Sequence, residues 1–307
     1  MQGLARTLAD PARGALRLAA LAAALLAAVA APVRAQTPRR DVQAELVQIE
    51  AETHCYNAPG PAEGEHRAIC VWRPPGSETQ TLPTLYAADG LIGLKILVAD
   101  YRAALLAGAQ IQPFLIVATD PRANPEERAG EYIRGWNGGA GGYRAHEQWV
   151  LSFVIPWAER TLRAAPDRAR RAVGGFSNGG DYALSMALDH PDVFSGALIH
   201  SPVGAAPNWA SGTGAGQRWV ITGGREETHG SVRATRPLGE EVGRALRSRG
   251  DAVRVCVGGW GHEGRAWRQL SAGSLVWLLG LGDVGAAQSD LERRSCQNTE
   301  AAAAPGD

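Results

Sequence analysis

The sequence predicts an α/β fold, with a mostly parallel sheet covered by helices on both faces. Two observations carry this prediction. From Ala68 onward, short β-branched or apolar runs alternate with amphipathic stretches, which is typical of parallel strands connected by helices. The length that remains after a predicted export signal also suits one large domain better than two small ones.

The expected elements follow the chain in regular alternation. Seven runs predict strands, at residues 69–72, 84–88, 114–118, 172–176, 197–200, 219–222 and 253–257. Apolar residues at helical spacing predict helices within residues 94–105, 149–157, 181–189, 238–246 and 267–278. Pro156 is expected to kink the second of these helices, because proline lacks the N–H that the helix needs.

The chain begins with an expected export signal. An almost unbroken Ala and Leu run at residues 18–31 follows three arginines, and small residues at 33–35 supply a signal peptidase site. We therefore expect residues 1–35 to be a signal peptide and the mature protein to be periplasmic or secreted. The apolar run is short for a membrane span, and no later run approaches ~18 apolar residues, so no stable membrane insertion is expected.

One catalytic domain is expected at residues 36–282, followed by a tail at 283–307. The tail is rich in Ala, Gly, Gln and Asp, a composition that predicts flexibility, with Cys296 as its anchor. The formal net charge is zero and Lys95 is the single lysine. Because no basic stripe exists to follow a phosphate backbone, nucleic acid is not an expected partner. The oligomeric state does not follow from the sequence.

The four cysteines predict two disulfides in an oxidising compartment. Three pairings are possible. We favour Cys55 with Cys70 and Cys256 with Cys296, because the first two bracket a short loop. A zinc site is not expected, since no C-x-x-C spacing is present.

The turn Gly175-Phe176-Ser177-Asn178-Gly179 is the strongest chemical signal in the chain. A G-x-S-x-G pattern alone arises by chance in a chain with 38 glycines, so its position matters more. It lies between a predicted strand and a predicted helix, as in a nucleophile elbow, where only small residues fit two positions before and after the serine. Ser177 is therefore the expected nucleophile of an α/β-hydrolase fold, and the Asn178 backbone amide is an expected oxyanion donor.

A serine nucleophile needs a histidine base and an orienting carboxylate, which in this topology follow the serine as acid and then histidine. His54, His66 and His146 precede Ser177 and are excluded by this order. His262 follows the last predicted strand on an open glycine-containing loop, so it is the expected base.

The expected acid lies in the loop after residues 219–222, where the residues alone leave Glu226 and Glu227 as alternatives. We prefer Glu226. Leu91, in the loop after residues 84–88, is the expected second backbone donor to the oxyanion. Asp89 in the same loop could simply cap the following helix.

Residues 259–264 satisfy the dinucleotide pattern G-x-G-x-x-G. They follow the last strand rather than the first, however, and Trp260 would crowd a pyrophosphate. No dinucleotide cofactor is expected.

With these residues assembled, the chain resembles the esterase family of α/β-hydrolases that includes enterochelin and other siderophore esterases, feruloyl esterases and mycolyltransferases. The similar segments are residues 82–90, 174–180, 189–194, 223–226 and 261–270, and Arg128, Glu131 and Tyr132 match a segment near the family's cleft. Trp260 departs from the family's usual Gly-Gly-His run.

The resemblance implies a serine carboxylic-ester hydrolase that works through an acyl-enzyme without metal or cofactor, and it selects Glu226 over Glu227. A small-molecule ester is the implied substrate. An acyltransferase acting on an envelope glycan or glycolipid is the alternative, and a binding protein on an inactive hydrolase scaffold is a third hypothesis.

Overall fold

The structure is a computed structural model that describes residues 42–203, 216–228, 235–283, 285 and 287–299. The predicted signal peptide at residues 1–35 lies outside this range. The helical elements are α2 (Val42–Glu52), α3 (Gly90–Leu106), α4 (Pro125–Tyr132), η1 (Trp136–Gly138), α5 (Gly141–Trp149), η2 (Val150–Val154), α6 (Ile155–Leu162), η3 (Arg168–Arg170), α7 (Asn178–Asp189), α8 (Thr235–Ser248), α9 (Gly264–Leu279) and α10 (Asp290–Ser295). The strands are β1 (His54–Pro59), β2 (His66–Trp72), β3 (Thr84–Ala88), β4 (Leu115–Thr119), β5 (Arg171–Phe176), β6 (Gly196–His200), β7 (Arg218–Gly224), β8 (Ala252–Gly258) and β9 (Cys296–Thr299).

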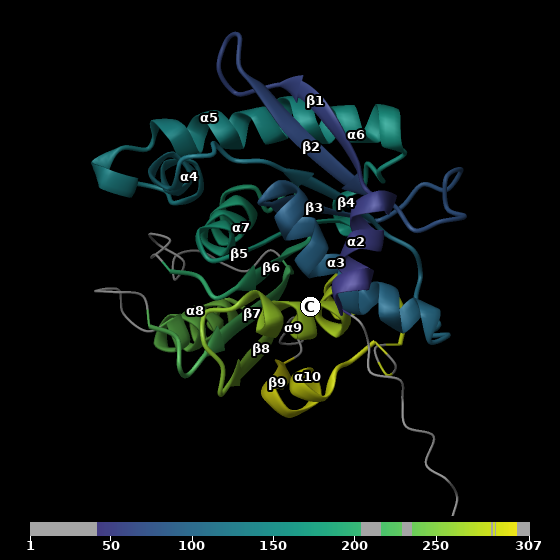
Figure 1. The fold of residues 1–307 in the computed structure, drawn as a ribbon. Helices are drawn as coiled ribbons and strands as arrows, with labels where there is room; N and C mark the ends of the chain where they lie inside the picture. The colour runs from purple at the N-terminus through teal and green to yellow at the C-terminus, as the bar shows by residue number, and fades with distance from the viewer. Residues whose placement is uncertain (1–41, 204–215, 229–234, 284, 286, 300–307) are drawn as a thin grey trace, which may run out of the picture. The chain divides into compact units, whose positions relative to one another are not determined.

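All nine described strands form one sheet, in the order β1-β2-β4-β3-β5-β6-β7-β8-β9 (Figure 1). The six strands from β4 to β8 in this order are parallel to one another. At one edge, β2 pairs antiparallel with β4 and β1 pairs antiparallel with β2, and at the other edge β9 pairs antiparallel with β8. The prediction of an α/β-hydrolase fold with a mostly parallel sheet is confirmed. Because β5, β6, β7 and β8 are parallel neighbours, the loops after them leave the same edge of the sheet.

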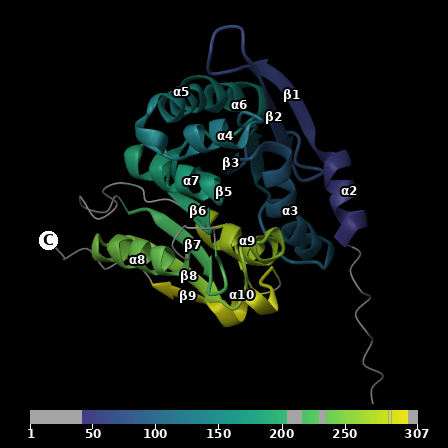
Figure 2. The same ribbon diagram turned by 60° about the vertical axis from the view of Figure 1, so that its left-hand side comes forward.

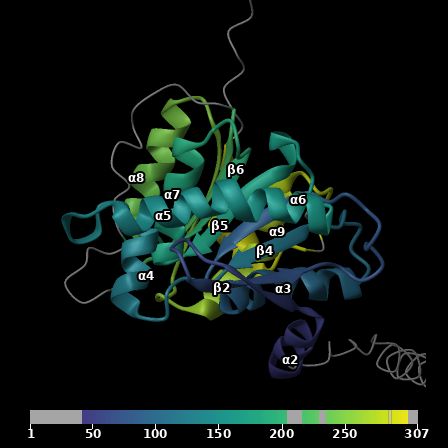
Figure 3. The same ribbon diagram turned by 90° about the horizontal axis from the view of Figure 1, so that it is seen from above.

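Helices cover both faces of the sheet (Figure 3). Alternate residues of β3 divide between two cores: Tyr86 and Ala88 pack on the face covered by α5, α6, α7 and α8, whereas Leu85 and Ala87 pack against α3 and α9. This division follows from the two-residue period of a strand, and it explains why the central strands are mostly apolar on both faces. Helices α3 and α9 lie side by side (Figure 2).

Each antiparallel edge is joined to its neighbour by a disulfide. Cys55 and Cys70 are cross-strand partners on β1 and β2, and Cys256 and Cys296 are partners on β8 and β9. The two favoured pairings are therefore confirmed, and they are compatible with an oxidising compartment.

The predicted flexible tail at residues 283–307 needs a correction. Residues 290–299 form α10 and β9, and Glu292 of α10 is fully buried where it accepts hydrogen bonds from the Gly273 amide, the Ser274 hydroxyl and Arg254. The folded part of the chain therefore extends beyond residue 282.

The predicted kink at Pro156 takes a different form. A single π-helical segment, Val150–Val154, leads into α6, and Pro156 lies in the first turn of α6. The wider π turn accommodates the missing proline N–H without a break in the helix. Over the described part of the chain, no helix has the length and apolar character needed to cross a membrane.

Candidate active site

Ser177 lies at the tight turn between β5 and α7, with φ 57° and ψ −129°. A positive φ is costly for a residue with a side chain and is held here by the surrounding packing. The Ser177 amide donates to the His200 carbonyl of β6 at 2.8 Å, and its own carbonyl accepts the Gly180 amide at 2.8 Å. A Cβ at Gly175 would lie 2.3 Å from the Gly179 carbonyl oxygen. The backbone therefore requires the small residues that the sequence pattern predicted.

His200, below this turn, is a buried structural histidine. The Ser271 hydroxyl donates its proton to the Trp267 carbonyl, so the Ser271 oxygen accepts a hydrogen bond from His200 Nε2–H at 3.1 Å. In the neutral ring, Nδ1 is then the acceptor, and the Thr222 hydroxyl donates to it at 2.9 Å. Burial lowers the pKa of His200 to about 3. The ring is thus neutral and helps to tie β6 to β7 and α9 beneath the site.

His262 lies beyond the end of β8, at the same edge of the sheet as Ser177. The Trp267 ring stacks on the Phe176 ring with centroids 4.8 Å apart, and it also makes an edge-to-face contact with the His262 ring at 4.8 Å. Phe176 immediately precedes Ser177. Trp267 therefore contacts both the predicted base and the residue before the predicted nucleophile.

The carboxylate that contacts His262 is Glu227, and the prediction that Glu226 would orient the ring needs a correction. His262 Nδ1 lies 2.9 Å from Glu227 Oε2, and the Glu227 side chain is 1% exposed. Glu226 is exposed, and its amide donates to the Trp260 carbonyl at 3.1 Å. The turn after Gly224 directs the second of the two carboxylates inward, because the Glu227 side chain accepts the Gly224 amide.

This contact sets the tautomer of His262. A carboxylate only accepts, so Nδ1 carries the proton, and Nε2 is left as the acceptor. That is the protonation state a general base requires.

Ser201, which the sequence analysis did not single out, also contacts the Glu227 carboxylate. Its hydroxyl donates to Glu227 Oε1 at 2.7 Å and accepts from Trp267 Nε1 at 2.7 Å. Ser201 follows β6 with φ 49°. Its position directly after a central strand was the only available signal, and it was weak, since the pairing with Glu227 depends on the order β6-β7 in the sheet.

Trp260, the departure from the family's Gly-Gly-His run, is buried under the acid loop. Its exposed fraction is 4%, and a Cβ at Gly224 would lie 2.0 Å from its carbonyl oxygen. A Cβ at Gly258 would lie 2.0 Å from the Trp260 ring. The paired glycines at the ends of β7 and β8 therefore let Trp260 pack between the loop after β8 and the loop after β7.

The two backbone amides expected to stabilise the oxyanion differ in whether an acceptor already lies beside them. Asn178 is the first residue of α7, where the amide has no acceptor within the helix. Leu91 lies in the first turn of α3, and its amide lies near the Asp120 carboxylate, which follows β4. Burial and the charge of Asp89 raise the pKa of Asp120, and the Leu91 amide opposes that rise.

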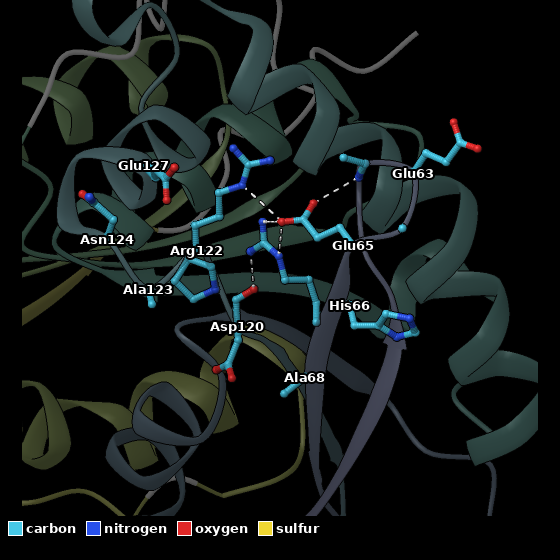
Figure 4. Close-up of a pocket in the computed structure, with 13 residues that line it drawn as sticks. Glu63, Glu65, His66, Ala68, Asp120, Arg122, Ala123, Asn124 and Glu127 are labelled. Carbon is cyan, nitrogen blue, oxygen red and sulfur yellow. Dashed lines mark hydrogen bonds and ion pairs between the residues drawn. The ribbon is translucent and has the colours of Figure 1, made fainter.

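A polar hollow of about 820 Å³ extends from Asp120 (Figure 4). In its wall, Arg67 pairs with Glu65 at 2.7 Å and with Glu131 at 2.6 Å, and Arg122 pairs with Glu65 at 3.2 Å. The Asp120 carboxylate points away from Glu65 and Arg122 (Figure 4) and fills the place of a Cβ on Gly90. The hollow therefore begins beside the loop that carries Leu91.

Among the described residues, no three His, Cys, Asp or Glu side chains come together as a metal site. The loops after β5, β8 and β7 bring Ser177, His262 and Glu227 to the same edge of the sheet.

Comparison with known families agrees with this geometry. The model of the family Esterase, described as “Putative esterase”, matches residues 61–269. The chain belongs to this esterase family. The predicted resemblance to this family is thus confirmed, and the protein is a hydrolase that acts on esters. No curated protein sequence matches the chain.

Solved structures with similar folds include several esterases. A siderophore hydrolase, EstA from Aspergillus nidulans, is 18% identical, with a TM-score of 0.58 over 76% of this chain and 95% of that chain. A ferulic acid esterase is 18% identical, with a TM-score of 0.56 over 75% and 97%. The enterobactin esterase FES from Shigella flexneri is 20% identical, with a TM-score of 0.54 over 74% of this chain and 58% of that chain. At these identities the likeness shows the fold.

Proposed function

We propose that this esterase hydrolyses a small-molecule carboxylic ester through an acyl-enzyme on Ser177, with His262 as base and Glu227 as acid. The observation that carries the proposal is the 2.9 Å contact between His262 Nδ1 and buried Glu227, beyond an elbow that holds Ser177 at positive φ. The carboxylate keeps the proton on Nδ1, so Nε2 is available to the serine hydroxyl.

In the first half-reaction, Ser177 Oγ attacks the ester carbonyl carbon while His262 Nε2 takes the hydroxyl proton. The tetrahedral intermediate then expels the alcohol, which receives that proton. Glu227 stabilises the imidazolium formed between these steps. In the second half-reaction, water attacks the acyl-enzyme with His262 again as base, which releases the acid and restores Ser177.

The negative charge on the carbonyl oxygen is stabilised by backbone amides. The Asn178 amide at the start of α7 is the first donor. The Leu91 amide is the second donor, and the substrate oxygen replaces the Asp120 carboxylate at this amide.

We further propose that residues 1–35 direct export and that the mature enzyme works in the periplasm or outside the cell. The two disulfides support this assignment, because such bonds persist in oxidising compartments.

The test is hydrolysis of p-nitrophenyl esters of increasing acyl length by the wild type, Ser177→Ala and His262→Ala. We expect both variants to lose at least about 10³-fold in kcat/KM while they keep the wild-type melting temperature. Wild-type turnover by Ser177→Ala would contradict the proposal.

A further inference from the structure

Helix α4 holds the loop before α3 through three hydrogen bonds. Arg128 Nε and Nη2 donate to the two carboxylate oxygens of Asp89 at 2.6 and 2.8 Å, and the Asp89 amide donates to the Tyr132 hydroxyl at 2.9 Å. Asp89 has φ 65° and is 8% exposed. The loop Asp89–Leu91 is therefore fixed to α4 by both main chain and side chain, and the Arg128–Asp89 pair is bidentate and largely removed from water.

The Asp89 carboxylate packs against the nucleophile elbow. Its Oδ2 lies 2.9 Å from the place that a Cβ on Gly179, in the first turn of α7, would occupy. On the other side of the loop, the Asp120 carboxylate reaches Gly90. Two carboxylates thus flank the amides proposed to stabilise the oxyanion, and Arg128 pairs with the one at the elbow. An unpaired charge at Asp89 would oppose the negative charge of the transition state.

We propose that Arg128 is a positioning residue for ester hydrolysis: it neutralises Asp89 and fixes the loop Asp89–Leu91 against the elbow, so that the Leu91 and Asn178 amides face the oxyanion. This inference rests on the proposed function. It gives the Arg128 and Tyr132 positions a specific role, distinct from that of Glu131, which pairs with Arg67 away from the elbow.

The folding of α4 does not depend on this pair. The Asn124 side chain caps its first turn by accepting the Glu126 amide at 2.9 Å, Pro125 begins the helix, and Ala129 and Tyr132 are buried against the core. Loss of the Arg128 guanidinium should therefore affect the chemistry more than the fold.

The first experiment compares Arg128→Gln with Arg102→Gln. Arg102 makes a similar bidentate pair with Glu52, remote from the loop, and both side chains are partly buried. We expect Arg128→Gln to lower kcat for a p-nitrophenyl ester about 30-fold with KM within about twofold, because the lost stabilisation is confined to the transition state. Arg102→Gln should keep the wild-type kcat. Arg128→Gln activity within threefold of the wild type would overturn the inference.

The second experiment separates charge from folding. Asparagine accepts positive φ well, so Arg128→Gln/Asp89→Asn removes the unpaired charge without strain in the loop. We expect the double variant to recover about tenfold in kcat over Arg128→Gln, and Arg128→Lys to recover part of the loss, because lysine restores the charge but not the bidentate contact. No recovery in either variant would refute the neutralising role of Arg128.

Ser177→Ala, assayed in the same series, separates the two hypotheses. Full activity in Ser177→Ala contradicts the proposed function itself. Loss of activity in Ser177→Ala together with full activity in Arg128→Gln contradicts only the role of Arg128.

Discussion

Replacement of Glu227 by glutamine tests which neighbouring carboxylate acts as the acid. Among the described contacts of Glu227, its Oε1 accepts from the Gly224 amide and the Ser201 hydroxyl, and its Oε2 accepts from His262 Nδ1–H. Glutamine has one oxygen and one NH₂ group. If its oxygen remains on Gly224 and Ser201, the NH₂ group faces His262 and forces the proton from Nδ1 to Nε2. The base then has no acceptor for the serine hydroxyl.

The size of the effect follows from the geometry. The imidazolium and the Glu227 carboxylate are in contact, with Nδ1 and Oε2 2.9 Å apart and the acid 1% exposed. Two unit charges about 4 Å apart attract by about 4 kcal/mol at an effective dielectric constant of about 20. Since about 1.4 kcal/mol corresponds to a tenfold change in rate, Glu227→Gln should lower kcat/KM about 10³-fold.

Glu226→Gln is the matched control, since it makes the same chemical change one residue away on an exposed side chain. We expect its kcat/KM to stay within about twofold of the wild type, as for other solvated charges. Both variants are assayed with p-nitrophenyl acetate, and their folding is checked by circular dichroism melts. A large loss in Glu226→Gln with near-normal activity in Glu227→Gln would refute the assignment and restore Glu226 as the acid.

Three further predictions concern the elbow, a buried histidine and a disulfide. Gly175→Ala should destabilise the fold by about 1–3 kcal/mol and lower esterase activity, because its Cβ would lie 2.3 Å from the Gly179 carbonyl oxygen; an unchanged urea midpoint would contradict this. Burial lowers the pKa of His146 to about 4, while the charge of Glu131 opposes this shift and the charge of Arg67 adds to it. The neutral imidazole therefore contributes stability at pH 7.5 that is lost as the pH falls from about 6.5 to 4. His146→Phe should lose about 2 kcal/mol less stability than the wild type between pH 7.5 and 5, and equal losses in urea unfolding would refute this prediction. Cys256→Ser/Cys296→Ser should lower the free energy of unfolding by about 4 kcal/mol, because the disulfide closes a loop of 40 residues, and a loss below about 1 kcal/mol would contradict the prediction.

The sequence predicted the central part of the fold because that part has strong periodicity. The five parallel pairings involve strands that are mostly apolar, and each strand had been expected within a few residues. The edge strands β1 and β9 were missed because His54–Pro59 and Cys296–Thr299 are short and polar. The favoured cysteine pairings were right, but a disulfide does not by itself indicate a strand. The same weakness made residues 290–299 resemble a tail.

Within the site, the sequence indicated the loops more reliably than the side chains. The order of the strands places the loops after β5, β7 and β8 at one edge, so Ser177, His262 and an acidic residue were expected together. The choice between Glu226 and Glu227 depends on one turn, in which the Gly224 amide binds the Glu227 carboxylate. A period-two or helical pattern does not determine such a turn, and the contribution of Ser201 depends on it as well.

The most direct test of the central claim is the chemical identity of the acyl-enzyme. A fluorophosphonate that mimics the tetrahedral intermediate is added to the wild type, Ser177→Ala and Glu226→Gln, and the adducts are measured by intact mass and peptide mapping. We predict one adduct for each wild-type molecule, located on Ser177, an equal adduct in Glu226→Gln and none in Ser177→Ala, with loss of esterase activity in proportion to labelling. An adduct on another residue, or full esterase activity in the labelled protein, would contradict the assignment of Ser177 as the nucleophile.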